Sequence, residues 1–520
     1  MKVKAKAGLL LASALMATSV AGCNQEIVDN GNVIIVWTTF NDDYGAIINK
    51  AIKNMKKKYP EYTVRYKKQS GGYNELKDMV VKGIAVGSYP DVTVAYPDSV
   101  TSFLDTGKGL NITPYMENEE YGWTEDDLDD IPEAYIEEGQ KYAYEGTYSL
   151  PICKSTEALF YNRSILVGLD LSSVNDEIND GRPLDDEYFS NLTWEELFGK
   201  LCPAIAEYDS KLAADKKIIT YPSKYTNNGA IVGYDSDDNF FITLAEQYGL
   251  PFTQINQQTG RGSAEFVIKE NGAFKDVSPE YLQLMEMIMG ATQDHKFGET
   301  NYKYLTTSAV LGARTNTVFT GKNGGMLFSI GSTGGTKYQD ASSGGKQDVG
   351  VTFLPTAEGA KRKAINQGPS VAFLKRGKNE QQEDMHAKGA WLFYKEWTSA
   401  ELGTSWATVT GYAPIRRSVA NSKEYIAYSS TEGKTAGSTA ILQARNAKLV
   451  ADNIDNLFSS PVYSKSGKAR EAVKAIFADL SKEDAKVPFD EGTAGYTTKL
   501  EAFHNAVRKV FKKAFEAAIK

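Results

Sequence analysis

The stretch VIIVWTTFNDDYGAIINKAIKNMKKKYPEYTVRY, residues 33–66, decides the fold. Its first five residues form a short apolar run of the kind that makes a buried strand. The next apolar residues recur at helical spacing and share one face: Ile47, Ile48, Ala51, Ile52 and Met55. Pro60 ends this helix, and 62–66 predict a second strand. A strand, a helix and a strand in this order indicate a parallel β-α-β unit.

The same pattern repeats directly downstream. Residues 72–87 have apolar side chains at helical spacing, and 90–95 predict a third strand. The sequence therefore predicts an α/β fold with a doubly wound sheet. Ligands of such sheets lie beyond the carboxyl ends of the strands, so the segments 38–43 and 96–99 are expected at a ligand site.

The beginning of the chain predicts a secretory signal. Lys2, Lys4 and Lys6 precede an uncharged stretch of roughly 15 residues, which is short for a membrane span of about 20. Its exit VAGC (20–23) matches the bacterial lipobox, in which diacylglycerol is attached to the cysteine and cleavage occurs just before it. A plain signal peptide with an incidental cysteine is the alternative.

We therefore expect residues 1–22 to be a lipoprotein signal peptide and Cys23 to carry diacylglycerol and palmitate. Residues 23–31 are polar and without periodicity, which predicts a lipid-anchored tether. The expected location is the outer face of the cell membrane.

Length and composition limit the classes of function that this protein can have. About 500 mature residues are too many for one core and predict two or three domains. Loss of residues 1–22 removes three lysines, so the net charge of −8 becomes −11. This sign argues against nucleic acid as a partner and against electrostatic adhesion to anionic lipid. We see no second segment that is long and apolar enough to cross a membrane.

Cysteine and histidine usage gives no sign of a cofactor. The spacing of Cys153 and Cys202 leaves a disulfide and two free thiols both open, and two free thiols are favoured because a chain of this length can build its core without staples. No CxxC, HExxH or Cys/His cluster suggests a metal. The three histidines, the missing GxSxG elbow and an incomplete P-loop at 433–435 give no support to an enzyme.

The acidic run DSDDNFFITLAE (235–246) has a partial calcium-loop pattern. Phe240 stands where that loop needs glycine, so a helix that begins near Asp237 or Asp238, with acids at its N-terminus, explains the run better. At the end of the chain, 497–520 predict an amphipathic helix. Core packing is favoured for this helix over a membrane surface.

Six local patterns then occur in a recognisable order: VIIVW (33–37), GGYNELKDMVVKGIAVGSYPDVTVAYPD (71–98), YSLPICKSTEALFYNRSIL (148–166), LTWEEL (192–197), FTGKNGGMLFSIGS (319–332) and HAKGAWLFYKEWTSAELGTSWATVTGYAPIRRS (386–418). With them, the chain from about 33 to about 420 resembles a family 1 extracellular solute-binding protein. Members of this family are lipoprotein receptors of bacterial ABC importers, most often for sugars. The resemblance implies a monomer without cofactor, a small-molecule ligand, the ABC permease as partner and no nucleic acid.

The resemblance implies a type II periplasmic-binding-protein-like fold, in which two α/β lobes joined by hinge strands close on the ligand. Crossings between lobes are expected near 153, 354 and 409. Lobe one would then be 32–153 plus 354–408, and lobe two 154–353 plus 409–520. The extended runs 148–152 and 349–355 suit hinge strands, and the polar insertion 169–191 adds to the size of the chain.

A sugar site needs flat side chains against the faces of the rings and carboxylates or amides for the hydroxyls. The loops that the resemblance brings to the site supply the expected contacts: Thr38, Asn41, Asp42, Tyr44, Tyr96, Asp98, Ser155, Glu157, Asp238, Phe240, Ser329, Gly331, Ser332, Trp406 and Tyr412. Core packing remains the alternative for each aromatic, and helix capping for Asp42 and Asp98.

The chain departs from the family at one point. Many sugar binders carry a stacking tryptophan after the Gly-Lys-x-x-Met strand, whereas this chain has SIGSTGGT (329–336) and no aromatic until Tyr338. Either another aromatic stacks on the ligand, or the ligand is not a plain oligosaccharide. A surface glycan-processing enzyme and an adhesin-type lipoprotein remain the alternative functions.

Overall fold

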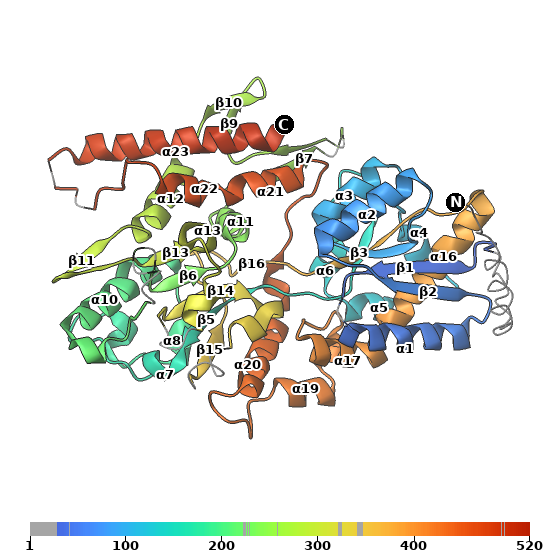
Figure 1. Ribbon diagram of the computed structural model, residues 1–520, viewed down its shortest axis with the longest axis horizontal. Coiled ribbons are helices and arrows are strands. Elements are labelled where there is room, and N and C mark those ends of the chain that lie inside the picture. The colour runs from blue at the N-terminus through green and yellow to red at the C-terminus, as the bar shows by residue number, and fades with distance from the viewer. Residues whose placement is uncertain are drawn as a thin grey trace, which may run out of the picture.

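The computed structural model describes residues 29–40, 42–221, 225, 227, 229–256, 258–259, 261–320, 325–340, 347–489, 491–492 and 494–520. The lipid site Cys23, the predicted contact Asn41 and the side chain of Asp42 lie outside this set. Two α/β lobes lie side by side (Figure 1), each built on one five-stranded mixed sheet. The predicted α/β fold with two lobes is confirmed.

Lobe one is the body built on the sheet β2-β1-β3-β17-β4. Its strands are β1 (Val33–Thr38), β2 (Thr63–Lys68), β3 (Val92–Ala95), β4 (Ser149–Pro151) and β17 (Ser370–Phe373). As predicted, β1 is parallel to both β2 and β3. The incoming strand β17 pairs antiparallel with β3 and β4, which makes the sheet mixed.

The helices of lobe one follow the predicted pattern closely. They are α1 (Asp42–Lys58), α2 (Tyr73–Ala85), α3 (Pro97–Asp105), α4 (Thr113–Met116), α5 (Glu125–Asp130), α6 (Glu133–Glu138), α16 (Glu380–Trp397) and α17 (Ala400–Thr410). On α1 the predicted apolar stripe faces the core, where Ile48 and Met55 are fully buried. This burial of one apolar face stabilises the helix on its sheet.

Lobe two is the body built on the sheet β13-β6-β14-β5-β15. Its strands are β5 (Glu157–Asn162), β6 (Val232–Tyr234), β13 (Leu305–Thr307), β14 (Phe328–Ser332) and β15 (Val349–Thr352). β6 is parallel to β13 and β14, while β5 runs antiparallel to β14 and β15. The two sheets therefore have the same arrangement, in which four strands are parallel and one strand, β17 or β5, runs antiparallel between two of them.

The remaining elements cover lobe two or extend it. The helices are α7 (Arg163–Leu166), α8 (Asp186–Ser190), α9 (Trp194–Glu196), α10 (Cys202–Lys211), α11 (Asp237–Gln247), α12 (Pro279–Ala291), α13 (Ser308–Leu311), α14 (Asn316–Phe319), α20 (Thr439–Asp452), α21 (Ser466–Lys474), α22 (Ile476–Ser481) and α23 (Tyr496–Ile519). Three hairpins join them: β7 (Thr253–Asn256) with β8 (Arg261–Ala264), β9 (Ile268–Glu270) with β10 (Ala273–Asp276), and β11 (His295–Phe297) with β12 (Thr300–Tyr302).

The C-terminal helix α23 lies across the outside of lobe two (Figure 1). Its apolar face, including Phe503, Val507, Val510, Phe511 and Phe515, is buried. The rings of Phe241 and Phe511 lie 5.9 Å apart. This face packs into the core, as the sequence favoured. Within the described residues, no helix combines the length and the apolar character of a membrane span.

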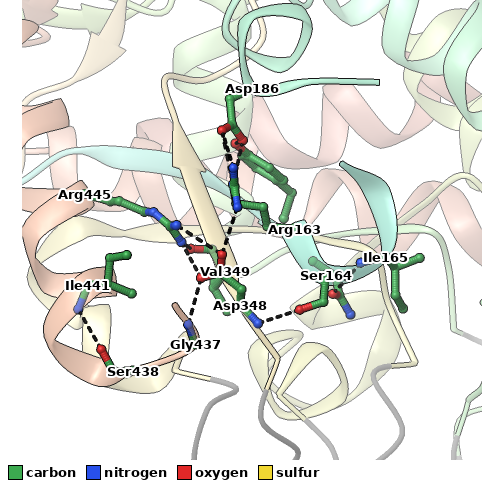
Figure 2. A network of polar contacts seen from close by, with 12 residues as sticks. Arg163, Ser164, Ile165, Asp186, Asp348, Val349, Gly437, Ser438, Ile441 and Arg445 are labelled. Atoms are coloured by element: carbon green, nitrogen blue, oxygen red, sulfur yellow. Dashed lines mark hydrogen bonds and ion pairs between the residues drawn. The ribbon is translucent and has the colours of Figure 1, made fainter. Parts of the chain in front are cut away.

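A charged network fixes α20 to the sheet of lobe two (Figure 2). Arg445 of α20 holds both oxygens of Asp348, at 2.6 and 3.1 Å. Arg163 donates to the same carboxylate at 3.1 Å and reaches Asp186 with its other nitrogens. The amide of Gly437 also donates to Asp348, at 3.1 Å. The network thus ties the returning chain to β15 through one buried carboxylate with two guanidinium partners.

The start of the described chain is clamped to lobe one. Arg376 donates to Asp29 at 2.6 Å and to the buried Asp91 at 2.9 Å. His386 lies against both carboxylates, with its Nδ1 3.0 Å from Asp91. Asp91 in turn accepts from the amide of Ile35 in β1 at 2.7 Å. The clamp thus ties the start of the described chain to β1 and to α16.

Three segments cross between the lobes, and they lie next to one another. One runs from β4 to β5, one from β15 to β17, and one follows α17. Isolated bridges pair Lys154 with Ala413 and Ser155 with Gln367. Gly368 sits at this junction with a positive φ of 99°, and a Cβ there would lie 2.3 Å from the carbonyl of Cys153. Only glycine fits such a close approach of two backbones.

The predicted lobe boundaries stay predictions at residue level. The first crossing falls at 151–157, around the predicted position 153. Between the predicted boundary at 354 and β17, Thr356 and Ala357 still hydrogen bond to residues of lobe two. Further along, the short strands β16 (Ala364–Ile365) and β18 (Leu457–Phe458) pair with each other in the junction.

Candidate ligand-binding site between the lobes

Four tyrosines gather where the strands of lobe one end and the crossing segments begin. Tyr96 directly follows β3, and its ring meets that of Tyr73 edge-on, with centroids 4.9 Å apart. Tyr412 lies in the third crossing, close enough for its phenol to interact electrostatically with those of Tyr44, Tyr73 and Tyr96. We call these four residues the tyrosine cluster. It puts flat, amphipathic side chains at the sheet edge where ligands of α/β folds bind.

The tyrosine cluster stays uncharged over the physiological range. Burial raises the pKa of Tyr96 to about 12, with Cys153 adding to the effect and Arg470 opposing it. Burial also raises the pKa of Tyr73 and Tyr412 well above the usual value of 10. The phenols of Tyr73, Tyr96 and Tyr412 are therefore neutral groups that can each donate one hydrogen bond and accept others. Such groups suit the hydroxyls of a polar, neutral ligand.

Two predicted carboxylates from opposite lobes meet through one arginine. Asp98, in the first turn of α3, lies 3.3 Å from Nε of Arg470. The Nη1 of Arg470 lies 2.9 Å from Asp238, in the first turn of α11. Burial raises the pKa of Asp238, but the Arg470 guanidinium outweighs this effect and holds the pKa below its usual value. Asp98 and Asp238 are therefore brought together on one guanidinium, and the lowered pKa keeps Asp238 charged at neutral pH.

Glu157 lies beneath the site at the start of β5. Its carboxyl accepts from the Tyr234 hydroxyl and, at 3.1 Å, from Asn239. Burial raises the pKa of Glu157 to about 8, although both hydrogen bonds lower it. Both hydrogen-bond partners, Tyr234 and Asn239, are neutral, so a large part of this carboxyl is protonated at neutral pH. Glu157 supports the floor of the site rather than presenting a free charge.

The loop after β14 brings lobe two to the crossing segments. Ser332 donates to Ser155 at 3.4 Å, so two predicted contacts lie side by side. A Cβ at Gly331 would lie 2.5 Å from Gln339, and one at Gly334 would lie 2.6 Å from the ring of Tyr412. The glycines of this loop thus let Tyr412 lie directly against lobe two.

Tyr338, the next aromatic in this loop, is half exposed at 49%. The Arg314 guanidinium lies 5.1 Å from its ring centroid and 3.5 Å from Asp235. Ser308 donates to Asp235 at 3.0 Å. Lobe two therefore presents a half-exposed aromatic ring with a nearby ion pair.

Seven predicted contacts are buried in this conformation: Thr38, Ser155, Glu157, Phe240, Ser329, Gly331 and Trp406. Phe240 is fully buried and stacks on Tyr234, with ring centroids 4.2 Å apart. Trp406 is 4% exposed and packs among Phe40, Tyr44 and Trp397. Ser329 is buried in mid-strand, and Thr38 is buried with its hydroxyl 3.0 Å from that of Tyr66. For the aromatics Phe240 and Trp406 the structure favours the core-packing alternative in this conformation.

Sequence reasoning missed Tyr73 and Arg470. Tyr73 was assigned to the apolar face of the helix at 72–87, but it is the first residue of α2 and therefore lies at the strand-end edge. Its position directly after the loop that leaves β2 was the signal that could have found it. Arg470 lies in α21, where no sequence pattern indicates contact with residues 98 and 238.

A second ion pair joins the crossing segments themselves. Lys154 is fully buried and bonds to Glu138, which is 2% exposed, and to Ser370 at 3.0 Å. Glu138 also accepts from Ser370 at 2.9 Å and from Asn366 at 3.1 Å. The pair is therefore neutralised and hydrogen bonded within the core, and it connects α6 with the first and second crossings.

Two open questions from the sequence have structural answers. Cys153 and Cys202 are both buried and free, as favoured. The acidic run begins the helix α11 at Asp237, as expected, and Asp237 accepts from Thr307 and from the amide of Ala309 at 3.2 Å. Among the residues that the structure describes, no group of three His, Cys, Asp or Glu side chains is placed to hold a metal.

Two lobes joined by three crossings, with polar and aromatic side chains between them, define a binding protein of the two-lobe class. The sequence model of the bacterial extracellular solute-binding protein family matches residues 50–432. The chain belongs to this family, as the local motifs suggested. The members of the family and its structural neighbours are binding proteins. A comparison with curated protein sequences gave no match.

Solved structures share the fold over nearly the whole chain. The GacH receptor of Streptomyces glaucescens, solved without ligand and with acarbose, is 15% identical with a TM-score of 0.55, covering 93% of this chain and 98% of its own. UgpB from Mycobacterium tuberculosis, in complex with glycerophosphocholine, is 13% identical with a TM-score of 0.56, covering 92% and 98%. The sugar-binding protein MalE from Xanthomonas citri is 12% identical with a TM-score of 0.56, covering 92% and 97%. At these identities the likeness shows the fold alone.

Proposed function

We propose that this protein is the substrate-binding lipoprotein of a bacterial ABC importer and captures a small carbohydrate between its lobes. The lipid on Cys23 would hold it at the outer face of the membrane, and the closed form would deliver the ligand to the permease. Only the closed form offers contacts from both lobes, so the ligand shifts the equilibrium toward it. Delivery by closure requires no covalent chemistry.

The tyrosine cluster carries the proposal. It supplies neutral phenols and ring faces at the strand-end edge, while Ser332 supplies a hydroxyl from lobe two. A sugar has apolar ring faces and polar edges that match this combination. The cluster also answers the missing tryptophan after β14, since tyrosines of lobe one and of the third crossing can take its place. The identity and length of the sugar are left to experiment.

A thermal-shift screen tests the proposal. Mono- and oligosaccharides, polyols, sugar phosphates and glycerophosphodiesters would be added to the purified protein one at a time. A ligand at 100 times its Kd stabilises the folded state by about 2.7 kcal/mol, which raises Tm by several degrees. A shift with at least one carbohydrate is expected. No shift with any carbohydrate, or release of a cleaved product, would contradict the proposal.

Two tyrosine variants localise the site. Tyr96→Ala and Tyr412→Ala should each weaken binding of the sugar found in the screen about tenfold, because each loses a stacking surface. Tyr144→Ala is the matched control, since Tyr144 is 48% exposed against 36% for Tyr96 and lies in another loop of lobe one. Titration calorimetry should show unchanged binding for the control. Equal loss in all three variants would point away from the cluster.

The anchor is tested separately. Cys23→Ala should release the protein from the membrane fraction or block its processing, while the folded body and its ligand binding stay intact. Mass spectrometry of the wild-type N-terminal peptide should find diacylglycerol on Cys23. A free Cys23 in the mature protein would refute the anchor but leave the binding function untouched.

A further inference from the structure

The helix α21 reaches across from lobe two to lobe one. It begins at Ser466, beyond the end of the family match at residue 432. Its neighbours α11 and α23 belong to lobe two, yet its first turns also contact α3 of lobe one. A Cβ at Gly467 would lie 3.8 Å from the Cβ of Asp98, so the two helices meet in close contact. The C-terminal part of the chain thus adds a contact between the lobes.

The contact between the two helices is polar and charged. The Ser466 hydroxyl donates to Asp98 at 2.5 Å, and Nε of Arg470 lies 3.3 Å from the other oxygen of the same carboxylate. Both oxygens of Asp98 are therefore occupied by groups of lobe two. A carboxylate between a hydroxyl and a guanidinium makes charge-assisted hydrogen bonds, which are the stronger kind.

Arg470 is held in place by lobe two alone. Its Nη1 donates to Asp238 at 2.9 Å and to Asn239 at 2.7 Å, both in the first turn of α11. These partners keep the guanidinium pointing at Asp98 without help from lobe one. Because the Arg470 side chain is already ordered, little conformational entropy is lost when the lobes meet. More of the ion-pair energy then remains as net attraction between the lobes.

We propose that Asp98, Ser466 and Arg470 form a latch that holds the lobes together before any ligand binds and so sets how much of the empty receptor is closed. The proposal rests on the proposed function for its biological meaning, since it describes regulation of the same site. Its physical content, a contact that biases the two lobes toward each other, can be measured without a ligand. The latch makes ligand affinity depend on residues from the C-terminal part of the chain.

The expected size of the effect follows from exposure. The side chains of Asp98 and Arg470 are 28% and 29% exposed, so water and salt partly screen the pair. A half-exposed pair in a small charged network shifts an equilibrium by roughly two- to tenfold. This is enough to change the open population without locking the receptor shut. A ligand with several contacts can still dominate the equilibrium.

The chain offers a closely matched control. Arg508 of α23 is 30% exposed and holds Asp276 at 2.9 Å and Glu501 and Asn505 at 3.1 Å each. Like Arg470, it joins two carboxylates and one asparagine amide. These three partners lie in lobe two, on β10 and α23. Arg508→Ala therefore removes the same chemistry without removing a contact between lobes.

Distances between spin labels on the two lobes test the latch. Labels at Asn74→Cys on α2 and Glu516→Cys on α23 use exposed positions, and the native Cys153 and Cys202 are buried. Cys23→Ala removes the remaining cysteine. Pulsed electron-spin resonance of the ligand-free protein would be compared for the wild-type latch, Arg470→Ala, Asp98→Asn and Arg508→Ala. Circular dichroism would check that each variant is folded.

We expect Arg470→Ala and Asp98→Asn to raise the ratio of open to closed receptor two- to tenfold, while Arg508→Ala leaves it unchanged. Raising NaCl from about 0.05 to 0.5 M should open the wild-type latch in the same direction and change Arg470→Ala little. Unchanged distances in both latch variants, an empty wild type without a closed population, or equal opening by Arg508→Ala would overturn the latch.

The latch and the proposed function fail separately. If no carbohydrate binds, the proposed function is lost, but the distances in the empty protein still decide on the latch. If a sugar binds and closes every variant from the same starting distances, the latch is lost while the receptor function stands. Should Arg470→Ala fail to fold, Asp98→Asn carries the test, because it keeps size and shape and removes one charge.

Discussion

Two of the ion pairs that lie where the lobes meet differ in burial. Lys154 and Glu138 lie in the junction of the crossing segments, with side-chain exposures of 0% and 3%. Asp98 and Arg470 lie between α3 and α21, with exposures of 28% and 29%. The first pair is enclosed by protein, including Ser370 and Asn366. The second is reached by water.

The difference separates a structural contact from an adjustable one. A buried pair cannot be broken without leaving a bare charge in the core, so it acts as a fixed part of the junction. A partly exposed pair can separate, because water solvates each of the two charges and the free-energy cost is small. The molecule thus places its fixed pair where the chain crosses and its breakable pair where the lobes only touch.

The largest effect is expected at the buried pair. Lys154→Ala should lower the free energy of unfolding by about 3–5 kcal/mol, because Glu138 is left charged and buried without its partner. Urea unfolding followed by circular dichroism would measure this loss. The double variant Lys154→Met with Glu138→Gln should regain a large part of it, since neither buried charge remains. A loss below 1 kcal/mol in Lys154→Ala would contradict a fixed role for the pair.

Glu157 offers a buried carboxyl to compare with Glu138. Its pKa is raised by burial from the ordinary 4.5 to about 8, so the folded state keeps a proton that the unfolded state loses between these pH values. Stability from this group is therefore greatest below pH 4.5 and declines as the pH rises toward 8. By pH 7 the decline amounts to roughly 3 kcal/mol.

Glu157→Gln should remove this decline, because glutamine resembles the protonated acid and can still accept from Tyr234. Unfolding free energies measured at pH 5, 6, 7 and 8 would show a flatter curve for the variant than for the wild type. Equal slopes for the two proteins would mean that Glu157 is already charged in the folded state.

The smallest effect on folding is expected at the half-exposed pair. Asp98→Asn should change the free energy of unfolding by no more than about 1 kcal/mol, although it opens the lobes in the distance measurement. Urea unfolding would check this prediction under the conditions used for Lys154→Ala. A loss of stability as large as that of Lys154→Ala would show that both pairs are fixed structural contacts, which would contradict the difference proposed between them.

Much of the fold follows from local patterns in the sequence. The run 33–66 has a strand period, a helix period and a proline stop in clear succession, and β1, α1 and β2 form as expected. Thr193 precedes α9 and accepts from the amide of Glu196 at 3.0 Å, a cap formed by residues three positions apart. These features depend on neighbouring residues only, so the sequence shows them directly.

The candidate site was harder to predict because it depends on which way each side chain points. Asp238 and Phe240 are two residues apart on α11, which turns about 200° between them. Asp238 therefore reaches Arg470 at the edge while Phe240 enters the core. Naming both as contacts ignored this rotation. Tyr44, Tyr96 and Tyr412 lie near one another in the structure, and their contact with a ligand stays a prediction.

Contacts between distant parts of the chain were not visible at all. Lys154 meets Glu138 across a turn of the fold, and Arg470 meets Asp98 over 372 residues of sequence. Neither pair has a spacing that a local pattern could reveal, and a buried lysine resembles any exposed lysine in the sequence. Such pairs depend on the tertiary arrangement alone.

The clamp at Asp29 limits the distance between lobe one and the membrane. If Cys23 carries the lipid, as proposed, six residue steps separate the lipid from a carboxylate that Arg376 holds to lobe one. A fully extended chain spans about 3.3–3.6 Å per residue, so the clamped edge stays within roughly 20 Å of the lipid head groups. The segment between the lipid and lobe one is therefore too short for the protein to rotate freely above the membrane. Lobe one would be the lobe held close to the membrane, and lobe two the lobe that moves relative to the bilayer when the receptor opens and closes.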